Sequence, residues 1–253
     1  MIIGGLQKFS LLDYPEHLSA IIFTQGCNFR CQFCYNPMLV EPKGLQELQN
    51  KASNTEELKR GHPQVEQIQG AINEDDLFYF LKKRAGKLDA VVITGGEPTI
   101  HADLPEFIQR VKALNYKIKL DTNGTNPEML IRLINSGLVD YIAMDIKAHE
   151  HKYDIVTGIQ PDLSKIKNSI RIIKENRIPY EFRTTLVPKL LNYEDIRKLG
   201  EMIEGAESWY LQQFWGETDL INISFENTPP YTEEEMDQMC YLGSKFVKAC
   251  NIR

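Results

Sequence analysis

Short apolar segments alternate with amphipathic segments along most of this chain, and this alternation is the feature that most limits its fold. Six segments rich in β-branched and aromatic residues predict strands, and most are followed by a helical pattern. This order favours a parallel sheet, because parallel strands need crossover helices. The predicted strands are 19–24, 89–94, 116–122, 139–146, 180–187 and 209–214, and the predicted helices are 73–85, 102–114, 126–136, 161–176, 193–204 and 232–249.

Six strand–helix units are too few for a complete eightfold barrel. We therefore expect an α/β fold in the form of a partial, open (β/α)6 TIM-type barrel, with a doubly wound sheet as the alternative. The length of 253 residues suits a single domain, 1–253, in which the polar segment 41–70 is an insertion. In both architectures the active site lies at the carboxyl ends of the strands.

Residues suited to chemistry follow four of the predicted strands. Taken singly, two glycines form a turn and an Asp–Lys pair forms a surface ion pair, but their convergence at successive strand ends predicts an active site. They are Cys27, Cys31 and Cys34 after 19–24, Gly95, Gly96 and Glu97 after 89–94, Asp121, Thr122 and Asn123 at the end of 116–122, and Asp145 and Lys147 at the end of 139–146.

Three of the five cysteines lie within eight residues, in the spacing C-x3-C-x2-C from Cys27 to Cys34. A structural zinc site needs four ligands, so zinc would require a histidine or Cys250 as the fourth. A cubane iron–sulfur cluster held by three thiolates instead leaves one iron open for catalysis. Cys240 and Cys250 are expected to be ordinary residues of the last helix.

The C-x3-C-x-aromatic-C motif, together with Gly95-Gly96-Glu97-Pro98, resembles the radical S-adenosylmethionine (SAM) superfamily. The resemblance implies one [4Fe–4S] cluster and SAM bound at its open iron. It assigns the cluster to Cys27, Cys31 and Cys34, the adenine contact to Phe33, and the contact with the amino group of SAM to Gly95, Gly96 and Glu97. The residue types suit these roles, since glycines allow close approach and a carboxylate pairs with an ammonium.

Further motifs resemble the glycyl-radical-enzyme activases. They are Asp121-Thr122-Asn123-Gly124, Asp145-Ile146-Lys147 and Arg183. The resemblance implies a monovalent cation near Asp121, Thr122 and Asp145, beside the SAM carboxylate, and it assigns Asn123, Lys147 and Arg183 to the same site. A cation there would offset the negative charge gathered at the cluster.

The segment from Lys8 to Pro15, continuing to the cysteines, is similar to the anaerobic ribonucleoside-triphosphate reductase activating proteins. This implies reductive cleavage of SAM to a 5′-deoxyadenosyl radical, which installs a glycyl radical on a partner enzyme. Anaerobic ribonucleotide reductase is the preferred partner, and a flavodoxin- or ferredoxin-type protein is the expected electron donor. The alternatives are an activase of pyruvate formate-lyase or a related enzyme, a radical SAM enzyme of the deazaguanine synthase type, and a non-enzymatic metal-binding redox module.

Two departures qualify the resemblance. Trp215 stands where the activase of pyruvate formate-lyase carries a histidine, so a SAM contact at that point is not expected. The segment 41–70 contains no cysteine, although some activases carry eight extra cysteines after the cluster loop. A single cluster is therefore expected.

The net charge and the hydropathy of the chain indicate which classes of partner it does not bind. The 29 Lys and Arg against 35 Asp and Glu give a net charge of −6, which disfavours nucleic acid binding. No apolar run reaches the ~20 residues that cross a bilayer, and residues 1–8 lack a signal-peptide pattern. We expect a cytoplasmic protein that contacts neither nucleic acid nor membrane.

His101, His149 and His151 are expected to be solvated loop residues.

Overall fold

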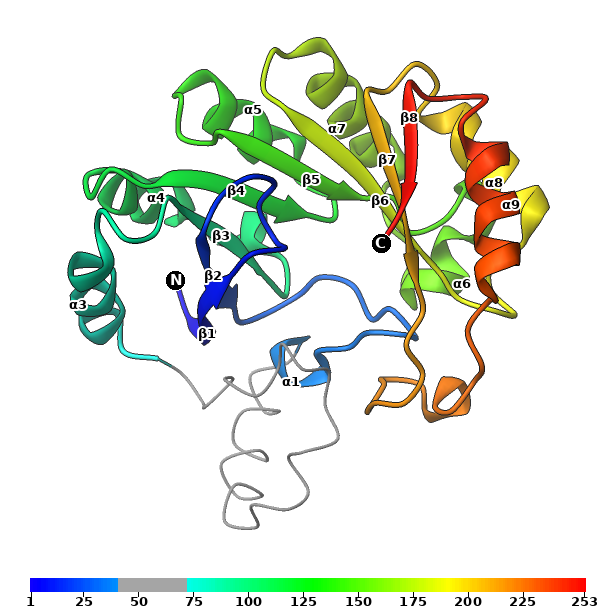
Figure 1. The fold of residues 1–253 in the computed structure, drawn as a ribbon, viewed down its shortest axis with the longest axis horizontal. Helices are drawn as coiled ribbons and strands as arrows, with labels where there is room; N and C mark the ends of the chain where they lie inside the picture. The colour runs from blue at the N-terminus through cyan, green and yellow to red at the C-terminus, as the bar shows by residue number, and fades with distance from the viewer. Residues whose placement is uncertain (41–71) are drawn as a thin grey trace. The chain divides into compact units, whose positions relative to one another are not determined.

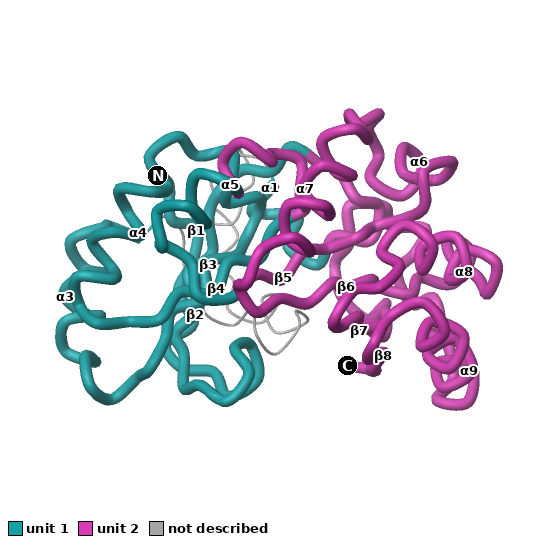
Figure 2. Tube along the Cα trace, turned by 90° about the horizontal axis from the view of Figure 1, so that it is seen from above, with its two compact units in different colours: residues 1–28, 35–122, 131–141 teal, residues 29–34, 123–130, 142–253 magenta. Residues whose placement is uncertain are grey.

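The structure is a computed structural model that describes residues 1–40 and 72–253. The contacts within the described residues divide them into two compact units (Figure 2). The first comprises the described residues within 1–28, 35–122 and 131–141, and the second comprises residues 29–34, 123–130 and 142–253. The expected insertion at 41–70 lies outside the described residues.

The first unit is built on four strands, coloured blue to green in Figure 1. β2 (Ser19–Thr24), β3 (Ala90–Gly95) and β4 (Lys117–Thr122) are parallel, whereas β1 (Ile3–Ser10) pairs with β2 in the antiparallel sense. The crossovers carry α1 (Pro37–Val40), α3 (Glu74–Arg84) and α4 (Leu104–Lys112). Every residue of β2 is buried, as expected for a central parallel strand.

The second unit continues the strand–helix alternation. β5 (Tyr141–Asp145), β6 (Tyr180–Leu186), β7 (Ser208–Gln213) and β8 (Ala249–Ile252) form successive parallel pairs. The helices are α6 (Tyr153–Thr157), α7 (Leu163–Glu175), α8 (Tyr193–Met202) and α9 (Glu233–Gly243). Both α5 (Pro127–Asn135) and β5, whose first residue Tyr141 belongs to the first unit, have residues in both units. None of the helices within 1–40 and 72–253 is long and apolar enough to cross a membrane.

Side-chain caps begin several of the helices. Asn73 accepts a 2.8 Å hydrogen bond from the backbone NH of Asp75, and Thr232 forms a capping box with Glu235. Asp103 immediately precedes α4, but its side chain forms no capping bond and instead accepts a hydrogen bond from the N-terminal ammonium of Met1.

All six predicted strands are present, but β1 and β8 were missed. The irregular register of β1 with β2, which shifts between Ile3 and Gly5 and between Gln7 and Ser10, breaks the alternation that predicts a strand. The last helix ends at Gly243 rather than at 249. The backbone NH groups of Lys248 and Ala249 instead donate to the carbonyls of Ala206 and Glu207, just before β7.

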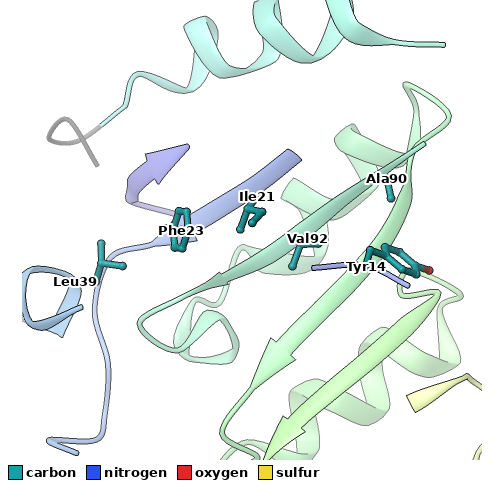
Figure 3. Close-up of a cluster of buried hydrophobic side chains, with 6 residues drawn as sticks. All are labelled: Tyr14, Ile21, Phe23, Leu39, Ala90 and Val92. Carbon is teal, nitrogen blue, oxygen red and sulfur yellow. The ribbon is translucent and has the colours of Figure 1, made fainter. Parts of the chain in front are cut away.

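One face of β2 and β3 forms an apolar cluster (Figure 3). Ile21 and Phe23 alternate along β2, and Ala90 and Val92 alternate along β3, so their side chains point to the same face. Tyr14 and Leu39 complete the buried cluster, and Tyr141 packs against it.

Candidate active site

The Gly95-Gly96-Glu97 turn is bonded directly to the segment that leads into Cys27. The NH of Gly96 donates to the carbonyl of Thr24, and the NH of Glu97 donates to the carbonyl of Gly26, both at 2.8 Å. A Cβ on Gly96 would lie 1.9 Å from the oxygen of Gly26, and Gly95 has φ +117°. Glycine is required at both positions, because a Cβ on Gly96 would meet the backbone of Gly26 and a Cβ on Gly95 would meet the backbone of Thr24 at the end of β2.

Glu97 is 1% exposed, and its carboxylate is held in a defined orientation. Its Oε1 accepts hydrogen bonds from the NH of Thr99 at 3.1 Å and from the Oγ1 of Thr122 at 2.7 Å. The hydroxyl of Thr99 donates to the same oxygen. A buried, oriented carboxylate suits recognition of an ammonium group, as expected for the amino end of SAM.

At the end of β4, Asp121, Thr122 and Asn123 each form hydrogen bonds with a different partner. Asp121 accepts a 2.7 Å hydrogen bond from the Nζ of Lys119, a buried lysine on the same strand. Asn123 accepts on Oδ1 from both the NH and the hydroxyl of Thr125, which is a turn-forming arrangement. Thr122 turns toward Glu97. Sequence reasoning placed Asp121, Thr122 and Asn123 together but did not predict these partners.

At the end of β5, Asp145 is held by two cations. Arg183 Nε lies 2.8 Å from its Oδ1, and Lys147 Nζ lies 3.0 Å from its Oδ2. Burial alone would raise the pKa of Asp145, but the adjacent Arg183 and Lys147 lower it to about 2. The three side chains are 11–23% exposed, so the alternative of an exposed surface pair is wrong.

Lys147 also links this array to the cysteine loop. Its Nζ lies 5.8 Å from the ring centroid of the buried Phe33. Burial alone would lower the pKa of Lys147, but the negative charge of Asp145, with a smaller contribution from an ionised Cys31, raises it, so the side chain of Lys147 stays protonated. Within the second unit the structure therefore brings together Cys31, Phe33, Asp145, Lys147 and Arg183.

The part of the cysteine loop from Arg30 to Gln32 is hydrogen-bonded to residues that the sequence did not indicate. The NH of Arg30 donates to the carbonyl of Thr157 at 2.8 Å, and Asn222 donates from its NH to the carbonyl of Gln32 at 2.9 Å. Gly158 ends α6 with φ +68°, and a Cβ there would lie 2.3 Å from the oxygen of Arg30. A glycine at the end of a helix could have indicated Gly158 from the sequence, but only the fold shows which loop packs against it.

The donor chemistry of the loop fits an iron–sulfur cluster. All five cysteines are thiols, and soft thiolates are the ligands that such clusters use. Cys27 belongs to the first unit, whereas Cys31 and Cys34 belong to the second. Within 1–40 and 72–253, no three His, Cys, Asp or Glu side chains are arranged to hold a metal ion, so ligation by these three cysteines stays a prediction.

Several residues outside the site differ from expectation. His149 is 4% exposed and bonded to Asp195, so the expectation of a solvated residue was wrong. Cys250 lies on β8 rather than on the last helix. Burial raises the pKa of the Cys250 thiol. Trp215 is 48% exposed.

Comparisons with known proteins match this chain to one superfamily and to activating enzymes. The family model described as Radical SAM superfamily matches residues 21–203. A protein of Methanocaldococcus jannaschii, named as a candidate glycyl-radical enzyme activating enzyme, is 32% identical over 100% of this chain and 95% of its own length. A pyruvate formate-lyase-activating enzyme of Streptococcus mutans is 26% identical over 80% of this chain and 72% of its own length.

Among solved structures, SuiB of Streptococcus suis bound to S-adenosylmethionine matches with a TM-score of 0.58 and 15% identity. The match covers 92% of this chain and 49% of SuiB, so this chain spans about half of that protein. At this identity the similarity shows the fold alone. Together with the family match, it confirms the expected α/β fold of the partial TIM-barrel type.

Proposed function

This chain is an enzyme that belongs to the radical SAM superfamily and to its glycyl-radical enzyme activating enzymes, and on this premise we propose that it installs a glycyl radical on an anaerobic ribonucleotide reductase. The observation that carries the proposal is the bonding of Gly96 and Glu97 to Thr24 and Gly26. It sets an oriented carboxylate beside the segment that enters the first cysteine. That is the arrangement needed to hold SAM next to a cluster.

In this proposal, Cys27, Cys31 and Cys34 hold one [4Fe–4S] cluster. When bound, the cluster and SAM would supply a carbon-centred radical that removes a hydrogen atom from a glycine of the partner. Such a partner glycine must be exposed on a flexible segment to reach the site. A flavodoxin- or ferredoxin-type protein would supply the electron, in the cytoplasm.

In this proposal the side chains of the protein would bind and orient SAM. Glu97 would accept a hydrogen bond from its amino group, and Gly95 and Gly96 would let the main chain lie close to the amino end. The ring of Phe33 would pack against the adenine. Lys147 stays protonated beside Asp145 and Cys31, so it is suited to hold the negative charge of the SAM carboxylate. Arg183 fixes Asp145 and thereby the position of Lys147.

The choice of ribonucleotide reductase rests on the segment from Lys8 to Pro15, which is similar to the activating proteins of that enzyme. Pyruvate formate-lyase is the second candidate partner. It is favoured by the 26% identity with an activase of that enzyme over 80% of this chain. Both candidates share the same chemistry in this chain and differ only in the protein that presents the glycine.

The first test is SAM cleavage. The full chain is reconstituted with iron and sulfide without oxygen, reduced, and mixed with SAM, and 5′-deoxyadenosine is measured. We expect cleavage by the wild-type protein and none by Cys31→Ala. The matched control is Cys240→Ala, which removes a thiol outside the loop and should leave cleavage intact. An intact cluster that leaves SAM uncleaved would refute the proposed chemistry.

The second test identifies the partner. Electron paramagnetic resonance is recorded after incubation with an anaerobic ribonucleotide reductase or with a pyruvate formate-lyase. A glycyl radical signal with the reductase alone is the expected result. A signal with the lyase alone would transfer the assignment to the second candidate. Cleavage of SAM with no radical on either protein would refute the proposed activation of these two enzymes.

A further inference from the structure

Lys119 is an unusual residue for the middle of a parallel strand. Its side chain is 1% exposed, and it lies on β4 directly beside Val92 of β3. Val92 belongs to the apolar cluster of Figure 3, against which Tyr141 packs. The aliphatic part of Lys119 therefore extends along an apolar face, and its ammonium must find a counter-charge within the protein.

Asp121 provides that counter-charge. The two residues are two positions apart on β4, so their side chains point to the same face of the strand. Lys119 Nζ donates to Asp121 Oδ1 at 2.7 Å, and the ring centroid of Tyr141 lies 5.9 Å from the same nitrogen. A carboxylate and an aromatic ring are both groups that attract a single positive charge.

This pairing conflicts with the monovalent cation implied by the resemblance to the activases. Each expected ligand already has a side-chain partner within its own unit. Asp121 is bonded to Lys119, and Thr122 donates its hydroxyl to Glu97. Asp145 is bonded to Arg183 and Lys147. A metal cation at Asp121 would also lie next to an ammonium of the same charge, which opposes its binding. The residues present therefore do not fit a monovalent metal ion.

We propose that the ammonium of Lys119 replaces the monovalent cation, so that this chain carries its own cation at Asp121. An ammonium has the same single charge as sodium or potassium and is held here by a covalent tether. The charge balance beside the SAM carboxylate is then independent of the salt around the protein. The role of Lys119 beside SAM rests on the proposed function. The absence of a metal site at Asp121 can be measured without SAM.

The test compares cation binding by the reconstituted full chain and its variants. Thermal unfolding is measured in potassium chloride and in choline chloride at equal ionic strength, and rubidium binding is measured by equilibrium dialysis. The wild-type protein should show the same melting temperature in both salts and no saturable rubidium binding. Lys119→Met removes the ammonium and should create a site. In that variant potassium should raise the melting temperature by at least about 2 °C, with saturable rubidium binding.

The matched control is Lys117→Met, which changes an exposed lysine of the same strand and should behave like the wild type. Lys119→Gln is the second variant if Lys119→Met does not fold. Saturable rubidium binding by the wild-type protein that Asp121→Asn abolishes would overturn the inference. So would a folded Lys119 variant that gains no cation dependence. Neither readout uses SAM cleavage or a partner enzyme, so failure of the proposed function would leave these results interpretable.

Discussion

Thr122 donates a 2.7 Å hydrogen bond from its Oγ1 to the Oε1 of Glu97. The sequence motif assigns Thr122 to a cation, but its hydroxyl orients the carboxylate proposed to bind SAM. The two residues come from the ends of neighbouring strands, β4 and β3, and their contact is buried. Thr122 is therefore a positioning residue for Glu97.

Thr122→Val should weaken SAM binding by about tenfold, since a hydrogen bond to a charged group is worth ~1.5–3 kcal/mol. The measurement is SAM affinity by equilibrium dialysis with the reconstituted protein, together with the rate of 5′-deoxyadenosine formation at saturating SAM. Thr122→Ser, which keeps the hydroxyl, should restore affinity. The control Thr184→Val removes a buried hydroxyl bonded to Trp209 and should lower stability alone. Equal affinities of Thr122→Val and wild type would contradict the positioning role.

Gly96→Ala should prevent the Gly95-Gly96-Glu97 turn from closing on the cysteine loop. The added Cβ would lie 1.9 Å from the oxygen of Gly26, and a backbone atom cannot move aside as a side chain can. We expect a loss of about 3 kcal/mol in the free energy of unfolding, measured in urea. Gly137→Ala is the control. It has φ +63° but nothing within 4 Å of the new Cβ, so only the ~1–2 kcal/mol of left-handed backbone strain applies. Equal losses would show that the close approach is unimportant.

The sequence predicted the place of the site better than its internal contacts. Parallel strands bring their carboxyl ends to one edge, so Glu97 after β3 and Thr122 at the end of β4 could be placed near each other from the pattern alone. The hydrogen bond between them depends on side-chain rotamers and could not be predicted. The tie between Arg30 and Thr157 was also missed, because nothing local indicates which loop a short helix such as α6 will meet.

Burial was the property least accessible to sequence reasoning. Lys117 and Lys119 occupy alternate positions in one strand, yet the first is exposed and the second is buried. The burial of Lys119 comes from its neighbours Val92, which lies on β3, and Asp121, which lies on the same strand. His149 was misassigned for the same reason, since its partner Asp195 lies 46 residues away at the start of α8.

The buried His149 should make stability fall below neutral pH. Its Nε2 lies 2.9 Å from Asp195 Oδ1, and its Nδ1 accepts from the NH of His151, which fits a neutral ring. Burial lowers the pKa of His149 despite Asp195, whose charge is also met by Lys152. The unfolded chain, with the ordinary pKa near 6.5, then binds more protons as the pH falls below that value. The contribution of His149 is complete above about pH 6.5 and is lost on acidification.

Urea unfolding between about pH 5 and pH 7 tests this dependence. The wild-type free energy of unfolding should decrease toward pH 5, by at most ~1.4 kcal/mol per pH unit for one proton. His149→Gln should be less stable near neutral pH but show a smaller slope. His151→Gln changes an exposed histidine of the same segment and should keep the wild-type slope. Identical slopes for the wild type and His149→Gln would exclude His149 as the source.

Arg253 should stabilise the second unit through the buried Glu181. Glu181 is fully buried on β6, and Arg253 Nη1 donates to its Oε1 at 3.1 Å. The guanidinium also lies 4.3 Å from the ring centroid of Tyr210 on β7. Arg253→Ala takes one cationic donor from a buried carboxylate. We expect a loss of ~2 kcal/mol in the free energy of unfolding, below the ~3–5 kcal/mol of a fully buried pair because Arg253 is 34% exposed.

The control is Lys248→Ala, which breaks the exposed pair with Glu207 and should cost less than ~1 kcal/mol. A double-mutant cycle separates the ion pair from the contact with Tyr210. In Glu181→Gln the carboxylate charge is gone, so the further change Arg253→Ala should cost clearly less than it does in the wild type. If Arg253→Ala costs the same in both backgrounds, the stabilisation comes from packing on Tyr210 and not from Glu181.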